Sequence, residues 1–196
     1  MKYYFLLVLG AAAAMAGPPL ICHPIDIGSA KSLPWKDLKN WNGTDPQYSL
    51  NALSTDTLAI LTPNAPIELR METLRRAAIY SAKSETAAEN LAARLVARIA
   101  DWEAAGKPSA NVWFDAGYYV ESLRQIKFVY RYNMMSAAEK AQWKVRDDDS
   151  GALDGKPWIE KAIRLGGKGM DVALAKIDEY RKADLKRPNA VVSAVK

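Results

Sequence analysis

Apolar residues after residue 63 recur with the 3.6-residue period of amphipathic α-helices. Three long stripes of this kind lie at 67–78, 88–102 and 112–130. Ser84 precedes the second stripe in the position of a helix N-cap, and Gly106 follows it as a terminator. The pattern predicts three long helices, each of which buries one apolar face.

Shorter helices are predicted in the rest of the chain. Ser136 and Glu139 have the spacing of a capping box and predict a helix that ends near residue 145. Two more are predicted at 157–165 and 170–185. Because no segment shows the alternation of a β-strand, the fold is predicted to be all-α. Helices of this length with short connections form a single-domain helical bundle or stacked helical hairpins.

The segment 17–62 differs from the rest because prolines interrupt it repeatedly. These are Pro18, Pro19, Pro24, Pro34 and Pro46. We call this segment the N-terminal arm and predict that it is irregular, with short helical pieces possible at 32–41 and 54–61, and that it lies over the helical core. The predicted organisation is a signal peptide at 1–16, the N-terminal arm, an α-helical domain at 63–187 and a frayed tail at 188–196.

The first sixteen residues have the layout of a secretory signal peptide. Lys2 supplies a positive charge, an apolar run follows at 5–13, and Ala14 and Ala16 provide the small residues of a cleavage site. The run is too short for a transmembrane helix, which needs about 20 apolar residues. The sequence therefore predicts a secreted or periplasmic protein that is not transmembrane after cleavage.

Composition and charge narrow the range of functions. The chain is 49% hydrophobic and 25% charged, as expected of a folded globular protein. It carries 27 basic and 22 acidic residues, a formal net charge of +5. This excess is mild and no nucleic-acid-binding module accompanies it, so nucleic acid is excluded as a partner.

The only cysteine and the only histidine of the chain are adjacent, in GPPLICHPIDIG. Cys22, alone or with His23 or Asp26, is the candidate for a metal or redox site. In an extended chain Cys22 and Asp26 share one face and His23 lies on the other, so a single metal held by Cys22 and His23 would need an irregular backbone. The alternative is a packed or exposed thiol beside a surface histidine. No other cofactor is predicted, and a single histidine excludes a multi-histidine zinc site.

A basic, aromatic face on the third predicted helix is the candidate for ligand binding. Its residues are Arg124, Lys127, Phe128, Arg131 and Tyr132. Cations attract acidic groups and aromatic rings stack on sugars or cations, so such a face suits a protein partner or an anionic ligand. The alternative is a solvated helix face whose long side chains cover apolar neighbours.

The acidic residues do not form a recognisable site. The aspartates at 147–154 match no register of an EF-hand loop. Glu72 is spaced for surface ion pairs with Arg75 and Arg76. Asp115 and Glu121 are six residues apart on one helix and therefore do not share a face.

These observations predict an exported helical protein that binds a protein partner or an anionic ligand, with no catalytic constellation evident. The alternative function is metal or redox handling through Cys22. The oligomeric state and the identity of the partner stay open at this stage.

Overall fold

The computed structural model describes residues 18–38, 40–131, 136–142 and 153–185. The described residues contain α-helices and one 3-10 helix but no named strand, which confirms the all-α prediction. The elements are η1 (Leu50–Ala52), α1 (Leu53–Ile60), α2 (Ile67–Ser81), α3 (Glu85–Ala104), α4 (Ala110–Arg131), α5 (Ala137–Gln142), α6 (Lys156–Arg164) and α7 (Met170–Leu185). The predicted signal peptide and frayed tail lie outside the described residues. None of the described helices is both long and apolar enough to cross a membrane.

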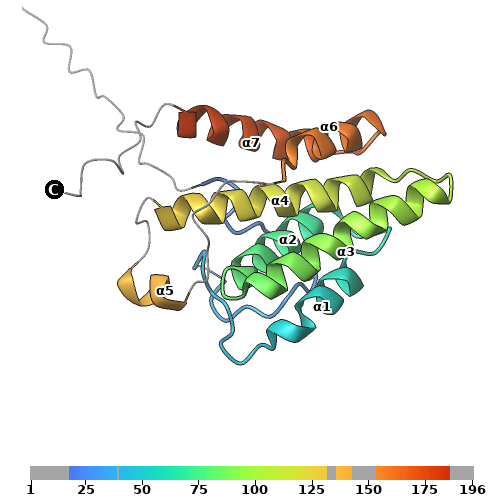
Figure 1. The fold of residues 1–196 in the computed structure, drawn as a ribbon. Helices are drawn as coiled ribbons and strands as arrows, with labels where there is room; N and C mark the ends of the chain where they lie inside the picture. The colour runs from blue at the N-terminus through green and yellow to red at the C-terminus, as the bar shows by residue number, and fades with distance from the viewer. Residues whose placement is uncertain (1–17, 39, 132–135, 143–152, 186–196) are drawn as a thin grey trace, which may run out of the picture.

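Helix α4 is the centre of the fold (Figure 1). It crosses the molecule with α6 and α7 on one side and α2 and α3 on the other. Because it is covered on both sides, the residues at 114–122 are all buried, polar ones included. Helices α3, α6 and α7 each bury one face, which is the arrangement that periodicity along a sequence reveals.

Helix α3 illustrates that pattern. The Ser84 side chain accepts a hydrogen bond from the Ala87 backbone N–H at 3.2 Å, so the predicted N-cap is confirmed. Leu91, Leu95 and Ile99 are buried in the core. Gly106 follows the helix with a φ of 64°, a conformation that favours glycine.

The backbones of α4 and α6 approach closely at two glycines. A Cβ built on Gly117 would lie 2.6 Å from the Gly155 carbonyl oxygen. A Cβ on Gly155 would meet the Gly117 carbonyl oxygen in turn. Glycine is needed at both positions because any side chain would force the two backbones apart.

The N-terminal arm lies against the helices. Leu20, Ile21 and Leu33 are at most 1% exposed and belong to the same core as α2, α3 and α4. The Leu20 N–H donates to Gln125 Oε1 of α4 at 2.8 Å. A single antiparallel bridge between Trp35 and Thr44 is its one piece of β-type pairing within the described part.

We expect Gly117→Ala to lower the free energy of unfolding by about 1–3 kcal/mol, because the methyl group would overpack the α4–α6 contact. Alanine is favoured over glycine in a helix by up to ~1 kcal/mol, so a net loss can only come from the clash. Urea denaturation followed by circular dichroism measures the change. An unchanged or increased stability would show that the two helices separate without cost.

Candidate ligand pocket beneath the N-terminal arm

Helix α2 carries four charged residues that the structure buries. Arg70, Glu72, Arg75 and Arg76 are between 0% and 7% exposed. The sequence predicted surface ion pairs here, and this prediction is wrong for Glu72, Arg75 and Arg76. The spacing of the pairs is as expected, but the N-terminal arm covers them and removes them from solvent.

Glu72 is the centre of this buried cluster and accepts four hydrogen bonds. Its Oε1 accepts from Arg75 Nη2 at 2.8 Å and Arg76 Nε at 2.7 Å. Its Oε2 accepts from Arg75 Nε at 2.7 Å and the Ile25 backbone N–H at 3.0 Å. Burial raises the pKa of Glu72, but these hydrogen bonds and the charge of Arg75 outweigh it and hold the pKa below its ordinary value.

The two arginines connect Glu72 to the backbone of the N-terminal arm. Arg75 Nη1 donates to the carbonyl oxygens of Ile21 at 3.0 Å and Trp41 at 2.9 Å. Arg76 Nη1 donates to the Leu33 carbonyl oxygen at 2.7 Å. The Trp35 ring lies 5.0 Å from the Arg75 guanidinium carbon and 5.3 Å from that of Arg76, at cation–π distance. Ion pairs on α2 thus fix the course of the arm.

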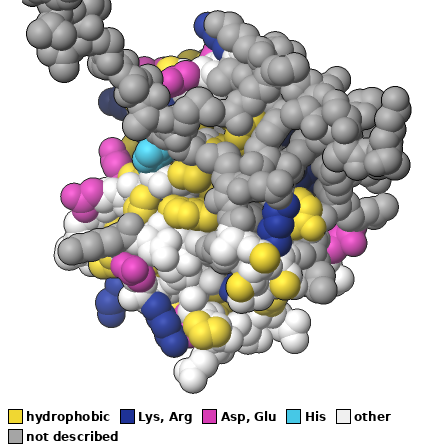
Figure 2. Space-filling model, turned by 90° about the vertical axis from the view of Figure 1, so that its left-hand side faces the viewer, with side chains coloured by type: hydrophobic (Ala, Val, Ile, Leu, Met, Phe, Trp, Pro, Cys, Tyr) yellow, Lys and Arg dark blue, Asp and Glu magenta, His cyan; other side chains and the backbone are white. Residues whose placement is uncertain are grey.

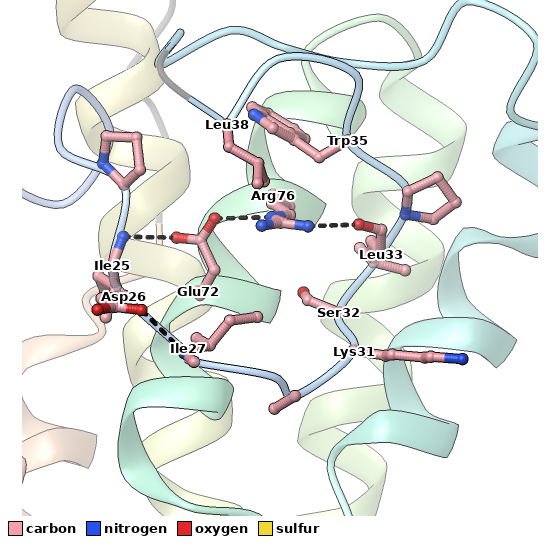
Figure 3. A pocket seen from close by; sticks show the side chains of 14 residues that line it. Ile25, Asp26, Ile27, Lys31, Ser32, Leu33, Trp35, Leu38, Glu72 and Arg76 are labelled. Atoms are coloured by element: carbon pink, nitrogen blue, oxygen red, sulfur yellow. Dashed lines mark hydrogen bonds and ion pairs between the residues drawn. The ribbon is translucent and has the colours of Figure 1, made fainter.

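The arm follows a ring-shaped course over α2 and leaves a pocket of about 560 Å³ inside the ring (Figure 3). Glu72 and Arg76 lie at its floor, between the two limbs of the arm. Asp26 and Lys31 are on opposite limbs. Most of the remaining lining is apolar: Pro24, Ile25, Ile27, Ala30, Leu33, Pro34, Trp35 and Leu38.

Arg76 gives the floor of the pocket an available hydrogen-bond donor. Its Nε and Nη1 are used by Glu72 and Leu33, whereas its Nη2 has no hydrogen-bond partner within the described part of the chain. The cluster contains two guanidinium groups and one carboxylate, so it carries a net charge of +1. An anion in the pocket would meet both a free donor and an uncompensated positive charge.

Two further ion-pair clusters hold the helices together. Arg70 Nη1 contacts both carboxylate oxygens of Asp115 on α4, at 2.7 and 2.9 Å. Burial raises the pKa of Asp115 to about 6 in spite of Arg70 and Arg98 nearby. Glu121 accepts from Arg181 Nη2 of α7 at 2.8 Å. Asp115 and Glu121 therefore have separate partners, in agreement with their separate faces in the sequence.

The candidate metal residues are not assembled into a site. No group of three His, Cys, Asp or Glu side chains that could hold a metal occurs among the described residues, which include Cys22, His23 and Asp26. Cys22 is half-buried, and burial raises the pKa of its thiol to about 11 against the opposing effect of Arg75. Asp26 is occupied in a turn, where its Oδ1 accepts from the Gly28 N–H at 2.8 Å.

The histidine is at the surface. His23 is exposed, and the space-filling view shows this single histidine on the face it draws (Figure 2). Hydrophobic side chains lie beside it in that view. The alternative sequence interpretation, a packed thiol beside a surface histidine, agrees with this arrangement.

The predicted basic, aromatic face on α4 is not one open surface. Phe128 is buried and packs edge-to-face on Tyr180 of α7, with ring centroids 5.3 Å apart. Its expected outward position is wrong, because α7 covers this part of α4. Arg124 is partly buried and lies 3.7 Å from Glu121, and Lys127 is also partly buried. The side chain of Arg131 and the whole of Tyr132 lie outside the described residues.

Sequence reasoning missed the pocket. Glu72, Arg75 and Arg76 have the spacing of ordinary surface ion pairs, so their pattern does not indicate that another segment covers them. The missing information was that arm and helix meet. Comparison with protein families, curated proteins and solved structures gave no match to this chain.

We expect Glu72→Gln to lower the free energy of unfolding by about 3 kcal/mol at pH 7, because it leaves two buried guanidinium groups without a counter-charge. The lowered pKa of Glu72 means that its stabilising effect is complete above its ordinary value of 4.5 and is lost as the pH falls through its folded-state pKa. The difference between wild type and variant should therefore narrow below about pH 4.

Urea denaturation from pH 3 to 7, followed by circular dichroism, measures this difference. Asp115 titrates in both proteins, so its effect on stability cancels in the comparison. A difference that stays constant down to pH 3 would show that the Glu72 charge is not what stabilises the arm.

We expect Cys22 to react slowly with the disulfide reagent 5,5′-dithiobis(2-nitrobenzoate). A pKa near 11 instead of 9.0 lowers the thiolate fraction at pH 8 by roughly 100-fold, and only the thiolate attacks. The rate, relative to that of glutathione, is measured by absorbance and should still be rising at pH 10. A rate equal to that of glutathione would restore Cys22 as a redox candidate.

Proposed function

We propose that the chain is an exported binding protein that holds an organic anion in the pocket between the N-terminal arm and α2. The observation that carries this proposal is Arg76, a 7% exposed side chain at the pocket floor with one guanidinium nitrogen unused. This nitrogen can be reached from the pocket, so water or a ligand can accept its hydrogen bonds. The cluster of Glu72, Arg75 and Arg76 carries a net charge of +1, and Arg76 presents part of this charge to the pocket.

The size and lining of the pocket support a small-molecule ligand. Ligand sites in proteins have volumes of roughly 300–1,000 Å³ and are mainly apolar, with a few polar groups that orient the ligand. The pocket of about 560 Å³ lies within this range. Its walls are mainly aliphatic and proline side chains with one tryptophan, and its polar groups are concentrated at the floor.

The chemistry of the floor favours binding over acid–base catalysis. Glu72 accepts four hydrogen bonds, and these occupy both carboxylate oxygens. Its lowered pKa makes it a weaker base than an ordinary glutamate. The guanidinium of Arg76 stays protonated at physiological pH and can donate a hydrogen bond without transferring the proton.

The pocket is a better candidate than the two sites expected from sequence. Among the described residues of the α4 face, Phe128 is buried and Arg124 is near the carboxylate of Glu121. Cys22 has no second and third ligand beside it within the described residues, and its raised pKa disfavours the thiolate that binds metals. The proposal therefore keeps the predicted anionic ligand and moves its site.

We expect the pocket to bind the fluorescent anion 1-anilinonaphthalene-8-sulfonate more tightly than N-phenyl-1-naphthylamine, which has the same rings without the sulfonate. Lys31→Glu should weaken the anion roughly threefold at low salt. The Lys31 side chain extends away from the pocket (Figure 3), so the reversed charge acts on the anion at long range and is screened by salt. Lys107→Glu makes the same charge change on an exposed residue outside the pocket and should leave the affinity unchanged.

Fluorescence titration of the purified protein measures both affinities. Equal affinity for the two dyes, or equal effects of the Lys31 and Lys107 substitutions, would refute an anion site in this pocket. Circular dichroism of each variant controls for unfolding.

A further inference from the structure

We infer that the ligand is a monocarboxylic acid with an apolar body, its carboxylate on Arg76 and its body between the two limbs of the N-terminal arm. This inference rests on the proposed function and narrows it to one chemical class. It depends on three properties of the pocket: its charge, its hydrogen-bond donors and its shape.

The charges around the pocket match a single negative charge. Asp26 and Lys31 on the two limbs carry opposite charges, and so do Glu72 and Arg76 at the floor. These four cancel, and Arg75 behind Glu72 leaves a net charge of +1. A phosphate or sulfate monoester needs several cationic donors, whereas a dianion here would approach the carboxylates of Asp26 and Glu72 with only one charge to neutralise it.

The free donors at the floor suit a carboxylate. Arg76 Nη2 supplies two N–H groups that have no acceptor among the described residues. Ser32, which also lines the pocket, shares its hydroxyl with Thr73 Oγ1 at 2.9 Å. The N–H groups of Ile25 and Gly28 are used by Glu72 and Asp26. One charged donor group is enough for a carboxylate but leaves most oxygens of a phosphate without a partner. The other cation of the lining, Lys31, extends its side chain away from the pocket (Figure 3).

The apolar walls define the rest of the ligand. Ile25 and Ile27 line one limb, and Leu33, Pro34 and Trp35 line the other (Figure 3). Leu38 continues this apolar surface at the edge of the pocket. It is 68% exposed, more than any other large hydrophobic residue among the described residues. A pocket of about 560 Å³ has the size of sites that hold small organic ligands.

A matched series of eight-carbon compounds tests this inference by displacement of the bound anionic dye from the purified protein. Octanoate should displace the dye at least tenfold better than octanol, which lacks the charge. It should also displace the dye at least tenfold better than octanedioate, which has a charge at both ends. Octyl phosphate should also be at least tenfold weaker. Because chain length is constant, the differences report on the head group.

Two substitutions locate the octanoate in the pocket. Leu38→Ala should weaken octanoate binding three- to tenfold, because part of an apolar contact is lost. Leu38 is 68% exposed, so we expect the variant to fold, and circular dichroism checks this. Arg76→Lys keeps the charge but loses the planar donor and should weaken octanoate at least tenfold. If Arg76→Lys does not fold, the affinities of Leu38→Ala and Lys31→Glu for octanoate test its location in the pocket.

The outcomes separate this inference from the proposed function. If the anionic dye binds in the pocket but octyl phosphate competes as well as octanoate, the proposed function stands and the carboxylate inference is wrong. Failure of octanoate to displace the dye also overturns the inference alone. If the dye itself shows no preference for its sulfonate, both are wrong.

Discussion

The buried cluster of Glu72, Arg75 and Arg76 is the interaction on which the course of the N-terminal arm depends. Removing one carboxylate and two guanidinium groups from water is costly, and the attraction between them compensates only when their hydrogen bonds are complete. Glu72 meets this condition with four donors, one of which is an arm N–H. Arg75 and Arg76 use most of their remaining hydrogen-bond donors on three carbonyl groups of the arm. The arm and the cluster therefore stabilise each other.

This mutual dependence explains how a segment rich in proline acquires a defined structure. The described part of the arm before η1 forms almost no regular backbone pairing, so its polar backbone groups need other partners. Side chains of α2 supply several of them, and Tyr80 adds another by donating to the Pro34 carbonyl oxygen at 2.7 Å. The ring-shaped course follows, because bonds to Ile21, Ile25, Leu33 and Trp41 fix the arm at points along its length.

The sequence predicted the helices better than the contacts between them. Periodicity and capping identified α3 because its single apolar stripe faces the core and Ser84 begins it. The same reasoning identified α2 and α4 as helices but not the burial of their polar faces, because both helices are covered on more than one side. Glu72 was interpreted as a surface residue, and Phe128 as part of an open face, because residue spacing along one helix carries no information on what packs against it. The pocket has residues from two distant segments and was invisible for the same reason.

Arg76 also connects the pocket to the anchoring of the arm. One guanidinium donates to Glu72, donates to Leu33 and faces the pocket. An anion bound to its free nitrogen would neutralise the excess charge of the cluster, which lowers the repulsion between Arg75 and Arg76. Because the pocket exists only while the arm is docked, any ligand of that pocket must also favour the docked arm, by the linkage between binding and folding. Ligand binding and docking of the arm would then be coupled, because Arg76 takes part in both.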